Sequence, residues 1–400
     1  MYSWEQCKLG SIGSTYTGLS GKTKEDFGHG EAQYITYLNV FQNTVSDITM
    51  TDKVEIDTTQ NEVKYGDVLF TTSSETPEEV GMSSVWLGHT PNIYLNSFCF
   101  GFRPNQKIDP YFLGYSLRAP YMRDKIKILA QGISRYNISK NKVMELEISL
   151  PNNEEQSLLG IFLRNIDLDI TLHQRKLDNL KLKKKALLQK LFPKNGERYP
   201  ELRFPGFTDA WEQRKLGDLL ILLKDGSHGT HKNTDAGVYL LSAKNIKNGR
   251  INIMPDDRII SWDDYNVIHK NYELQIGDIL LTIVGSIGET AIFNLKTKVT
   301  FQRSVAFLRP NSNLNNGFLY TLINTDRFQN QLQTKQVVSA QPGIYLGDLA
   351  TIDITYPKNI LEQEKIYNIF REIENSITLH QRKLDHLQLQ KKALLQQMFV

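Results

Sequence analysis

The chain has 400 residues and 40% hydrophobic content, which is enough for two domains that each bury a core. Its 47 basic and 44 acidic side chains leave a net charge of only +3, so composition alone does not indicate a nucleic-acid-binding protein. The two cysteines exclude a disulfide framework and a thiolate metal site, and the apolar runs are far shorter than a membrane span, so we expect a cytoplasmic protein without membrane contact.

Residues 1–155 form the first predicted domain. It opens with Trp4-Glu5-Gln6 and Lys8-Leu9-Gly10, and it ends near Ile148-Ser149-Leu150-Pro151, which precedes Glu155-Gln156. Short apolar or β-branched runs alternate with glycine-bounded turns such as the one at Gly66-Asp67. This pattern predicts a mixed α+β domain with substantial strand content.

Residues 156–193 predict one long helix. Apolar side chains recur at alternating steps of four and three residues, which is a heptad seam, and no Pro or Gly interrupts it after Gly160. Seven of the residues from Ile170 to Phe192 are Lys or Arg, against the single acid Asp178. At about 1.5 Å per residue the helix would extend roughly 50 Å. The seam includes Ile170, His173, Leu177, Leu180, Leu187 and Leu191.

Residues 194–210 are rich in Pro, Gly and charge, and predict a linker. They carry the segment Glu201–Phe207 directly before Trp211. No equivalent of this segment precedes Trp4.

Residues 211–360 repeat the first domain. Trp211-Glu212-Gln213 answers to Trp4-Glu5-Gln6, and Leu308-Arg309-Pro310 answers to Phe102-Arg103-Pro104. The run Ile279–Val284 predicts a strand, and Asn316–Leu332 predicts a helix. By contrast, residues 14–33 hardly match residues 224–239. The two predicted domains therefore share a common framework of landmark motifs and differ in the segments between those motifs.

Residues 361–400 predict a second long helix. Ile377–Phe399 differs from Ile170–Phe192 at only five of twenty-three positions, at an offset of 207 residues. A lone helix would leave its apolar stripe in water, so we expect the two helices to pair as a coiled coil; the alternative is that each packs only on its own domain. A polar residue on such a seam more often sets register than binds a ligand. This second seam includes Ile377, His380, Leu384, Leu387, Leu394 and Met398.

Signatures of catalysis are scarce. Asp57, Glu62 and Lys64 have the residue types of a metal-dependent nuclease centre, but a short charged strand before the Gly66-Asp67 turn explains them as well. Gly285-Ser286-Ile287-Gly288 lacks the lysine of a P-loop and predicts a turn between strands. We therefore assign no catalytic residue, metal site or bound cofactor to the chain.

The divergent segments contain side chains suited to DNA. Arginine reads guanine, asparagine reads adenine, and lysine mostly neutralises phosphate, although loops are often polar simply because water surrounds them. The candidates in the first domain are Lys22, Lys24, Tyr34, Thr36, Tyr37 and Asn39. Those in the second domain are Lys224, Ser227, His228, Thr230, His231, Lys232, Lys244, Asn245, Lys247 and Arg303.

Two similar but unequal domains joined by a helical spacer suit a DNA target with two unlike parts. Successive accessible major-groove faces lie about 34–36 Å apart, and a paired helical spacer can set such a separation. Because the loops of the two domains differ, the expected target is asymmetric.

In this order, the motifs resemble the specificity subunit of type I restriction-modification systems. The resemblance covers essentially the whole chain and rests on Glu201–Phe207 leading into Trp211, on Gly277-Asp278 running into Gly285–Gly288, on Gln341-Pro342-Gly343-Ile344, and on the duplicated His-Gln-Arg-Lys-Leu-Asp helices. It implies two target recognition domains joined by an antiparallel coiled coil, without an active site.

The resemblance also implies the partners. These are double-stranded DNA, two modification subunits that bind S-adenosylmethionine and methylate adenine, and two restriction subunits that use ATP and Mg²⁺. The segment from Arg135 to Ser139 and its counterpart from Gln341 to Tyr345 are expected to face DNA or to close the domains. The alternatives are a stand-alone nuclease using Asp57, Glu62 and Lys64, and a structural protein that only joins two binding domains.

Overall fold

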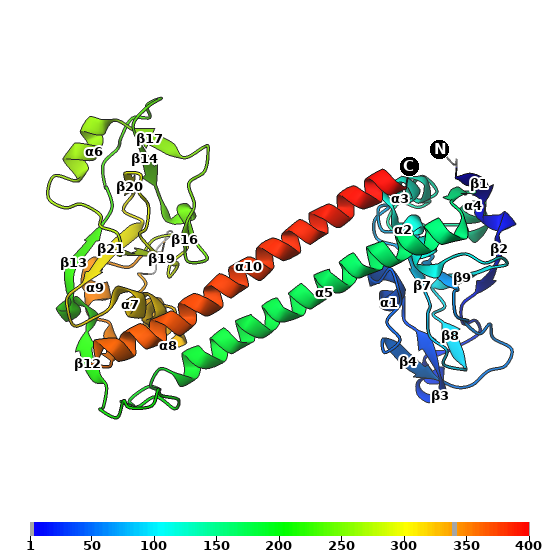
Figure 1. Cartoon of the computed structure of the whole chain (residues 1–400), viewed down its shortest axis with the longest axis horizontal. Coiled ribbons are helices and arrows are strands. Elements are labelled where there is room, and N and C mark those ends of the chain that lie inside the picture. The colour runs from blue at the N-terminus through cyan, green and yellow to red at the C-terminus, as the bar shows by residue number, and fades with distance from the viewer. Residues whose placement is uncertain (1–3, 338–341, 400) are drawn as a thin grey trace. The chain divides into compact units, whose positions relative to one another are not determined.

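The computed structural model describes residues 4–337 and 342–399 and is drawn in Figure 1. The chain divides into two compact units. Unit 1 combines the residues up to Arg175 with the segment from His380 onward, and unit 2 comprises Lys176–Leu379. Each unit therefore holds one globular domain together with parts of the two long helices α5 (Asn153–Lys190) and α10 (Ile360–Met398).

Domain 1, the globular part of unit 1, mixes short strands with short helices. Its strands are β1 (Glu5–Lys8), β2 (Gly13–Thr17), β3 (Phe27–Ile35), β4 (Thr51–Val54), β5 (Val68–Thr71), β6 (Ser73–Ser74), β7 (Ser83–Val85), β8 (Ile93–Leu95), β9 (Cys99–Pro104), β10 (Tyr136–Asn137) and β11 (Glu147–Leu150). Its α-helices are α1 (Tyr37–Gln42), α2 (Pro110–Arg118), α3 (Pro120–Ile128) and α4 (Lys140–Met144).

Domain 2, the globular part of unit 2, has the same kinds of element. Its strands are β12 (Glu212–Lys215), β13 (Leu220–Asp225), β14 (Val238–Leu241), β15 (Ile246–Lys247), β16 (Arg250–Ile251), β17 (Arg258–Ile260), β18 (Ile279–Thr282), β19 (Thr290–Ile292), β20 (Val299–Phe301), β21 (Val305–Pro310) and β22 (Asp353–Tyr356). Its α-helices are α6 (Trp262–Ile268), α7 (Asn316–Ile323), α8 (Asp326–Thr334) and α9 (Leu346–Ala350).

Three sheets of each domain have matching topology, whereas the pair β6–β10 of domain 1 and the pair β15–β16 of domain 2 do not correspond. A four-stranded sheet runs β2-β9-β5-β7 in domain 1 and β13-β21-β18-β19 in domain 2. A three-stranded sheet runs β4-β3-β8 and β17-β14-β20, with one parallel pair in each case, β3 with β8 and β14 with β20. A two-stranded sheet joins the two ends of each domain, β1 to β11 and β12 to β22. The expected pair of similar α+β domains is confirmed.

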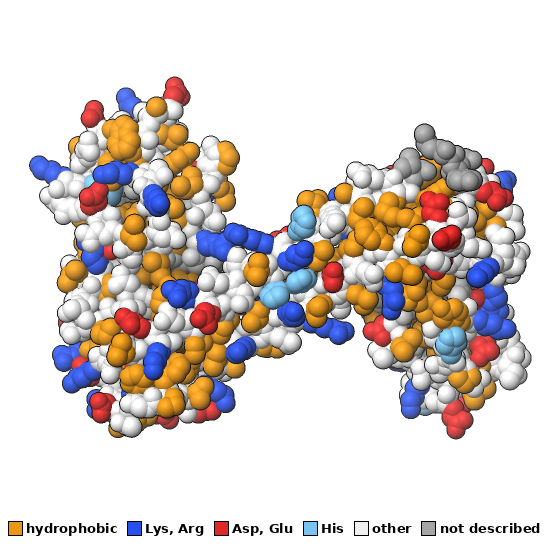
Figure 2. Space-filling model, in the orientation of Figure 1, with side chains coloured by type: hydrophobic (Ala, Val, Ile, Leu, Met, Phe, Trp, Pro, Cys, Tyr) orange, Lys and Arg blue, Asp and Glu red, His pale blue; other side chains and the backbone are white. Residues whose placement is uncertain are grey.

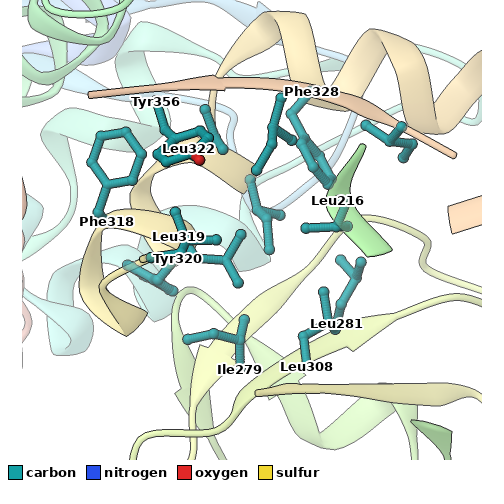
Figure 3. Packing of buried hydrophobic residues seen from close by; sticks show 14 of the residues in the cluster. Leu216, Ile279, Leu281, Leu308, Phe318, Leu319, Tyr320, Leu322, Phe328 and Tyr356 are labelled. Carbon is teal, nitrogen blue, oxygen red and sulfur yellow. The ribbon is translucent and has the colours of Figure 1, made fainter. Parts of the chain in front are cut away.

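Residues that recur in both halves of the sequence make equivalent contacts in the two domains. The indole of Trp4 donates to Glu155 at the start of α5, and the indole of Trp211 donates to Glu362 at the start of α10. In domain 2, Leu216 directly after β12 and the strand residues Ile279, Leu281 and Leu308 share one core cluster with side chains of α7 and α8, as Figure 3 shows.

A buried ion pair recurs in each four-stranded sheet. Arg103 and Arg309 each donate two hydrogen bonds to the aspartate of the Gly-Asp turn, Asp67 and Asp278 respectively, at 2.7–2.8 Å. Hydrogen bonding to these aspartates raises the pKa of both arginines. Such bidentate pairs hold both guanidinium groups against the buried aspartates.

Two local predictions are wrong. The helix expected over Asn316–Leu332 is divided into α7 and α8, because the Thr325 side chain accepts from Phe328 N and caps a new helix. The charged strand expected before Gly66-Asp67 is not a strand: β4 ends at Val54, and Asp57 accepts from Thr59 to hold a turn.

Within each unit, α5 and α10 pack antiparallel. In unit 1, His173 meets His380 and Asp167 pairs with Lys391, while Phe399 packs against Trp4 and Phe112. In unit 2, Lys184 pairs with Glu374, and Phe192 packs on Phe370. All seam side chains named from the sequence are buried or half-buried. Over residues 4–337 and 342–399, no helix combines the length and apolar character needed to cross a bilayer.

Candidate nucleic-acid interface

One turn occupies an equivalent place in both domains. It links the last strand of the three-stranded sheet to the central strand of the four-stranded sheet, and we call it the connecting turn. In domain 1 it is Asn96–Phe98, between β8 and β9; in domain 2 it is Gln302–Ser304, between β20 and β21. The landmarks Phe102-Arg103-Pro104 and Leu308-Arg309-Pro310 place Ser97 opposite Arg303.

The same backbone hydrogen bonds hold the connecting turn in each domain. In domain 1, Asn96 N donates to Ile35 O at 3.1 Å, and Thr72 N donates to Phe98 O at 2.9 Å. In domain 2, Gln302 N donates to Leu241 O at 2.8 Å, and Ile283 N donates to Ser304 O at 2.9 Å. These equivalent hydrogen bonds hold the turn at the same place in each domain, while the side chains of the turn differ.

A glycine lies against the turn in each domain. Gly18 N donates to Cys99 O, and Gly226 N donates to Val305 O. A Cβ atom on Gly18 would lie 2.1 Å from Asn96 O, and one on Gly226 would lie 2.2 Å from Phe301 O. The close approach of the two backbones therefore requires glycine at both positions.

The loop after Gly226 is held by a chain of side chains. Ser227 Oγ lies 2.6 Å from His231 Nε2, and His231 Nδ1 lies 3.2 Å from Asp264 Oδ1. Hydrogen bonds from His231 and Ser261 lower the pKa of Asp264. Arg258 also donates to the His231 carbonyl. The loop is therefore fixed while His228 at its tip stays 64% exposed.

The loop after Gly18 is held by a different set of contacts. Lys22 pairs with Asp57 at 2.8 Å, and Ser20 N donates to Gln60 Oε1. The hydrogen bond from Lys22 lowers the pKa of Asp57. Glu62 accepts from Asn92 N at 2.7 Å. Both carboxylates of the nuclease hypothesis thus have structural partners.

The structure separates the remaining candidates by exposure. Asn39 and Asn245 are buried, and their amides donate to groups inside their own domains. Lys24, Arg135, Thr230, Lys232, Lys247 and Arg303 are exposed. Lys244 is exposed as well but pairs with Asp257 at 2.8 Å.

Besides Lys22, Ser227 and His231, four candidates are partly buried and have contacts within their own domain. Tyr34 donates to Asp52, Thr36 caps α1, and Tyr37 donates to Ser73 O. The Lys224 ammonium lies 4.5 Å from the ring centroid of Tyr272.

The connecting turns present different chemistry to solvent. In domain 1, Phe98 is 55% exposed, and the Arg135 guanidinium lies 5.7 Å from its ring centroid. In domain 2, Arg303 is exposed in the middle of the turn. The expected counterpart of the Arg135 segment reaches Ile344, whose N–H donates to Ile283 O, whereas Gln341 lies outside the described residues. The turns therefore bring together Phe98 with Arg135 and Arg303 with Ser227.

Phe98, Gly18 and Gly226 were missed by sequence reasoning. Counting back six residues from Arg103 and Arg309 would have aligned the two turns.

Figure 2 shows that Lys and Arg side chains also gather along α5 and α10, whose exposed residues include Lys176, Lys181 and Lys185. Over the part of the chain that the structure describes, no group of three or more His, Cys, Asp or Glu side chains is arranged to hold a metal ion.

A family model described as the type I restriction modification DNA specificity domain matches residues 1–182 and again residues 208–389. The chain belongs to this family. It is a specificity subunit without catalytic activity of its own, and neither the nuclease nor the purely structural alternative is supported.

Relatives of the chain span nearly its full length. The MjaX type I restriction enzyme specificity subunit of Methanocaldococcus jannaschii is 23% identical over 411 residues, covering 98% of this chain and 92% of the relative. The MjaVIII specificity subunit of the same organism is 23% identical over 73% of this chain and 69% of its own length. A crystal structure of the S subunit from M. genitalium has the same fold, with a TM-score of 0.62, 15% identity, and coverage of 99% of this chain and 96% of that one.

Proposed function

We propose that each domain of this specificity subunit reads one part of a split, asymmetric DNA sequence. The observation that carries the proposal is the connecting turn, which has the same backbone hydrogen bonds in both domains but different exposed side chains, Phe98 with Arg135 in one and Arg303 in the other. A shared frame fixes where the chain approaches DNA, and differing side chains give each domain its own sequence preference.

The partners in this proposal are double-stranded DNA, modification subunits and restriction subunits. Two modification subunits would carry S-adenosylmethionine and methylate adenine, and two restriction subunits would use ATP and Mg²⁺, while this chain holds none of these cofactors. The basic, exposed faces of α5 and α10 outside the seam are the proposed docking surface. The proposed organisation is 1–155 and 211–360 as recognition domains, 156–193 and 361–400 as paired helices, and 194–210 as linker.

We assign each candidate residue a role in DNA binding according to whether its side chain is exposed or buried. Exposed lysines such as Lys24, Lys232 and Lys247 would neutralise phosphate, and each should contribute about one counterion to the salt dependence of binding. Asn39 and Asn245 would support the loops from inside, because their amides are buried.

Mapping of adenine methylation tests the proposal. Mixed-sequence DNA is incubated with the modification subunit and S-adenosylmethionine, with and without this chain. We expect methylation at one bipartite, asymmetric sequence with a fixed gap, only when the chain is present. Methylation that is indifferent to the chain would contradict the proposal and would favour a structural role.

A further inference from the structure

We propose that Arg303 is the residue with which domain 2 reads a guanine in its part of the target, and that Ser97 is the equivalent reading position in domain 1. The inference rests on the proposed function and adds to it which position of the fold faces a base. The connecting turn has equivalent backbone hydrogen bonds at its first and last residues in both domains.

The backbone on either side of Arg303 is fixed before any DNA arrives. Arg303 N donates to Ser227 O at 3.0 Å, and Val305 N donates to Gln302 O at 3.1 Å. The hydroxyl of Ser304 accepts from Ala243 N at 3.1 Å. Binding therefore has to order only the arginine side chain, which keeps the entropic cost of contacting a base low.

The guanidinium of Arg303 is available, unlike those of Arg309 and Arg258 in the same domain. Arg309 is bound to Asp278 in the frame, and Arg258 donates to Asn233 and to the His231 carbonyl. Arg303 is exposed and, among the described residues, has no carboxylate within ion-pair distance. A free guanidinium on a rigid turn can donate two parallel hydrogen bonds to O6 and N7 of guanine in the major groove.

Neighbouring loops flank Arg303 with further polar groups. The loop that begins at Gly226 touches the turn on one side and carries exposed His228 and Thr230. The segment at Ala243, which precedes exposed Lys244, touches it on the other side. Because the turn is bonded to both segments, a base contacted by Arg303 would also lie near groups suited to phosphate and sugar contacts.

Domain 1 has the same turn with a different residue in its middle. Ser97 is exposed, and its short side chain cannot make a bidentate contact with guanine. Its neighbour Phe98 offers an apolar surface with Arg135 over the ring, which suits contact with a thymine methyl group rather than a guanine edge. The two turns therefore explain how one frame reads two unlike sequences.

Methylation mapping with turn variants tests this inference. We expect Arg303→Ala to lose preference for guanine at one position of one half of the target, by about 10- to 100-fold, while the other half is read as before. Ser97→Arg is expected to add guanine preference at one position of the other half. Arg214→Ala, an exposed arginine on β12 in the frame, is the matched control and should leave the target unchanged.

The outcomes separate the two proposals. If the wild-type chain directs no sequence-specific methylation, the proposed function fails and this inference falls with it. If the wild-type chain is specific and Arg303→Ala retains the same guanine discrimination, only this inference is overturned. An unchanged target with Ser97→Arg would overturn the equivalence of the two turns. Thermal unfolding of each variant identifies any loss of specificity that comes from misfolding.

Discussion

His173 and His380 meet with their Nδ1 atoms 2.8 Å apart and are separated by 207 residues, which is also the offset of the internal repeat. Each histidine is thus the sequence counterpart of the other. A hydrogen bond between two Nδ1 atoms needs one donor and one acceptor, so two equivalent positions carry rings in different roles. A polar pair at such a position favours one register of the helices at a cost in stability.

We expect replacement of this pair to be strongly non-additive. His173→Leu alone removes a hydrogen bond from half-buried His380 and should lower the free energy of unfolding by about 1–3 kcal/mol. The double variant with His380→Leu should be neutral or stabilising, because leucine fits the apolar seam. Urea unfolding of the two single variants and the double variant gives the coupling energy. Additive effects would show that the histidine contact does not hold the helices.

Arg203 in the linker should be essential to unit 2. Its guanidinium donates to both carboxylate oxygens of Glu362, at 2.8 and 2.9 Å, with the two side chains only 15% and 2% exposed. Arg203→Ala would leave a buried carboxylate without its cation and should destabilise the unit by about 3 kcal/mol or more. Lys194→Ala removes an exposed pair with Glu201 and is the control, with an expected change below about 1 kcal/mol. Similar shifts in their unfolding midpoints would contradict the structure.

Gly226 should tolerate no side chain. A Cβ atom there would lie 2.2 Å from Phe301 O and 2.4 Å from Gln302 O, so Gly226→Ala has to displace the connecting turn. We expect loss of specific methylation in the half read by domain 2, with the other half retained. Gly347→Ala, at a position on α9 with no atom within 4 Å of the new Cβ, should be harmless or stabilising by about 0.5–1 kcal/mol. Equal methylation by the two variants would exclude this role for Gly226.

Unit 2 should lose stability in mild acid because of His269. Burial lowers the pKa of this histidine below its ordinary value of 6.5, and its Nδ1 and Nε2 lie within hydrogen-bond distance of Tyr272 O and Thr300 Oγ1. The unfolded chain binds a proton near pH 6.5 while the folded chain does not, so stability rises with pH through this window. The contribution is complete above about pH 6.5 and is lost as pH falls through the folded pKa.

His269→Gln, which does not titrate, tests this expectation. Unfolding of the variant should depend less on pH than unfolding of the wild type between about pH 5 and 7. Parallel curves for the two proteins would mean that other groups set the acid sensitivity.

The pair of similar domains and the two long helices were predictable, because the internal sequence repeat indicates both. The same hydrogen bond joins Trp4 to Glu155 and Trp211 to Glu362. It explains why a tryptophan and a glutamate recur at these positions of the repeat. The boundary between α7 and α8 escaped prediction, since the cap at Thr325 ends a pattern whose apolar spacing continues.

The site was less predictable because exposure depends on tertiary contacts. Asn39 and Lys22 have residue types that suit DNA, yet the first is buried and the second pairs with Asp57. Phe98 has an apolar side chain, so a search for polar loops passes over it. Gly18 and Gly226 lie in segments whose sequences hardly match, and only the backbone contacts show that they are equivalent.

Phe399 directly after α10 packs against Trp4 and Phe112, and Met398 at the end of α10 joins the same core, whose other members come mostly from residues 4–170. The ribosome, however, makes the start of the chain first and the end of α10 last. Until residues 380–399 emerge, the nascent first domain exposes the apolar side chains of α5 that this segment will cover, including Leu163 and Ile166. The first domain to be made is therefore the last to be finished, and chaperones have most reason to bind it during that interval.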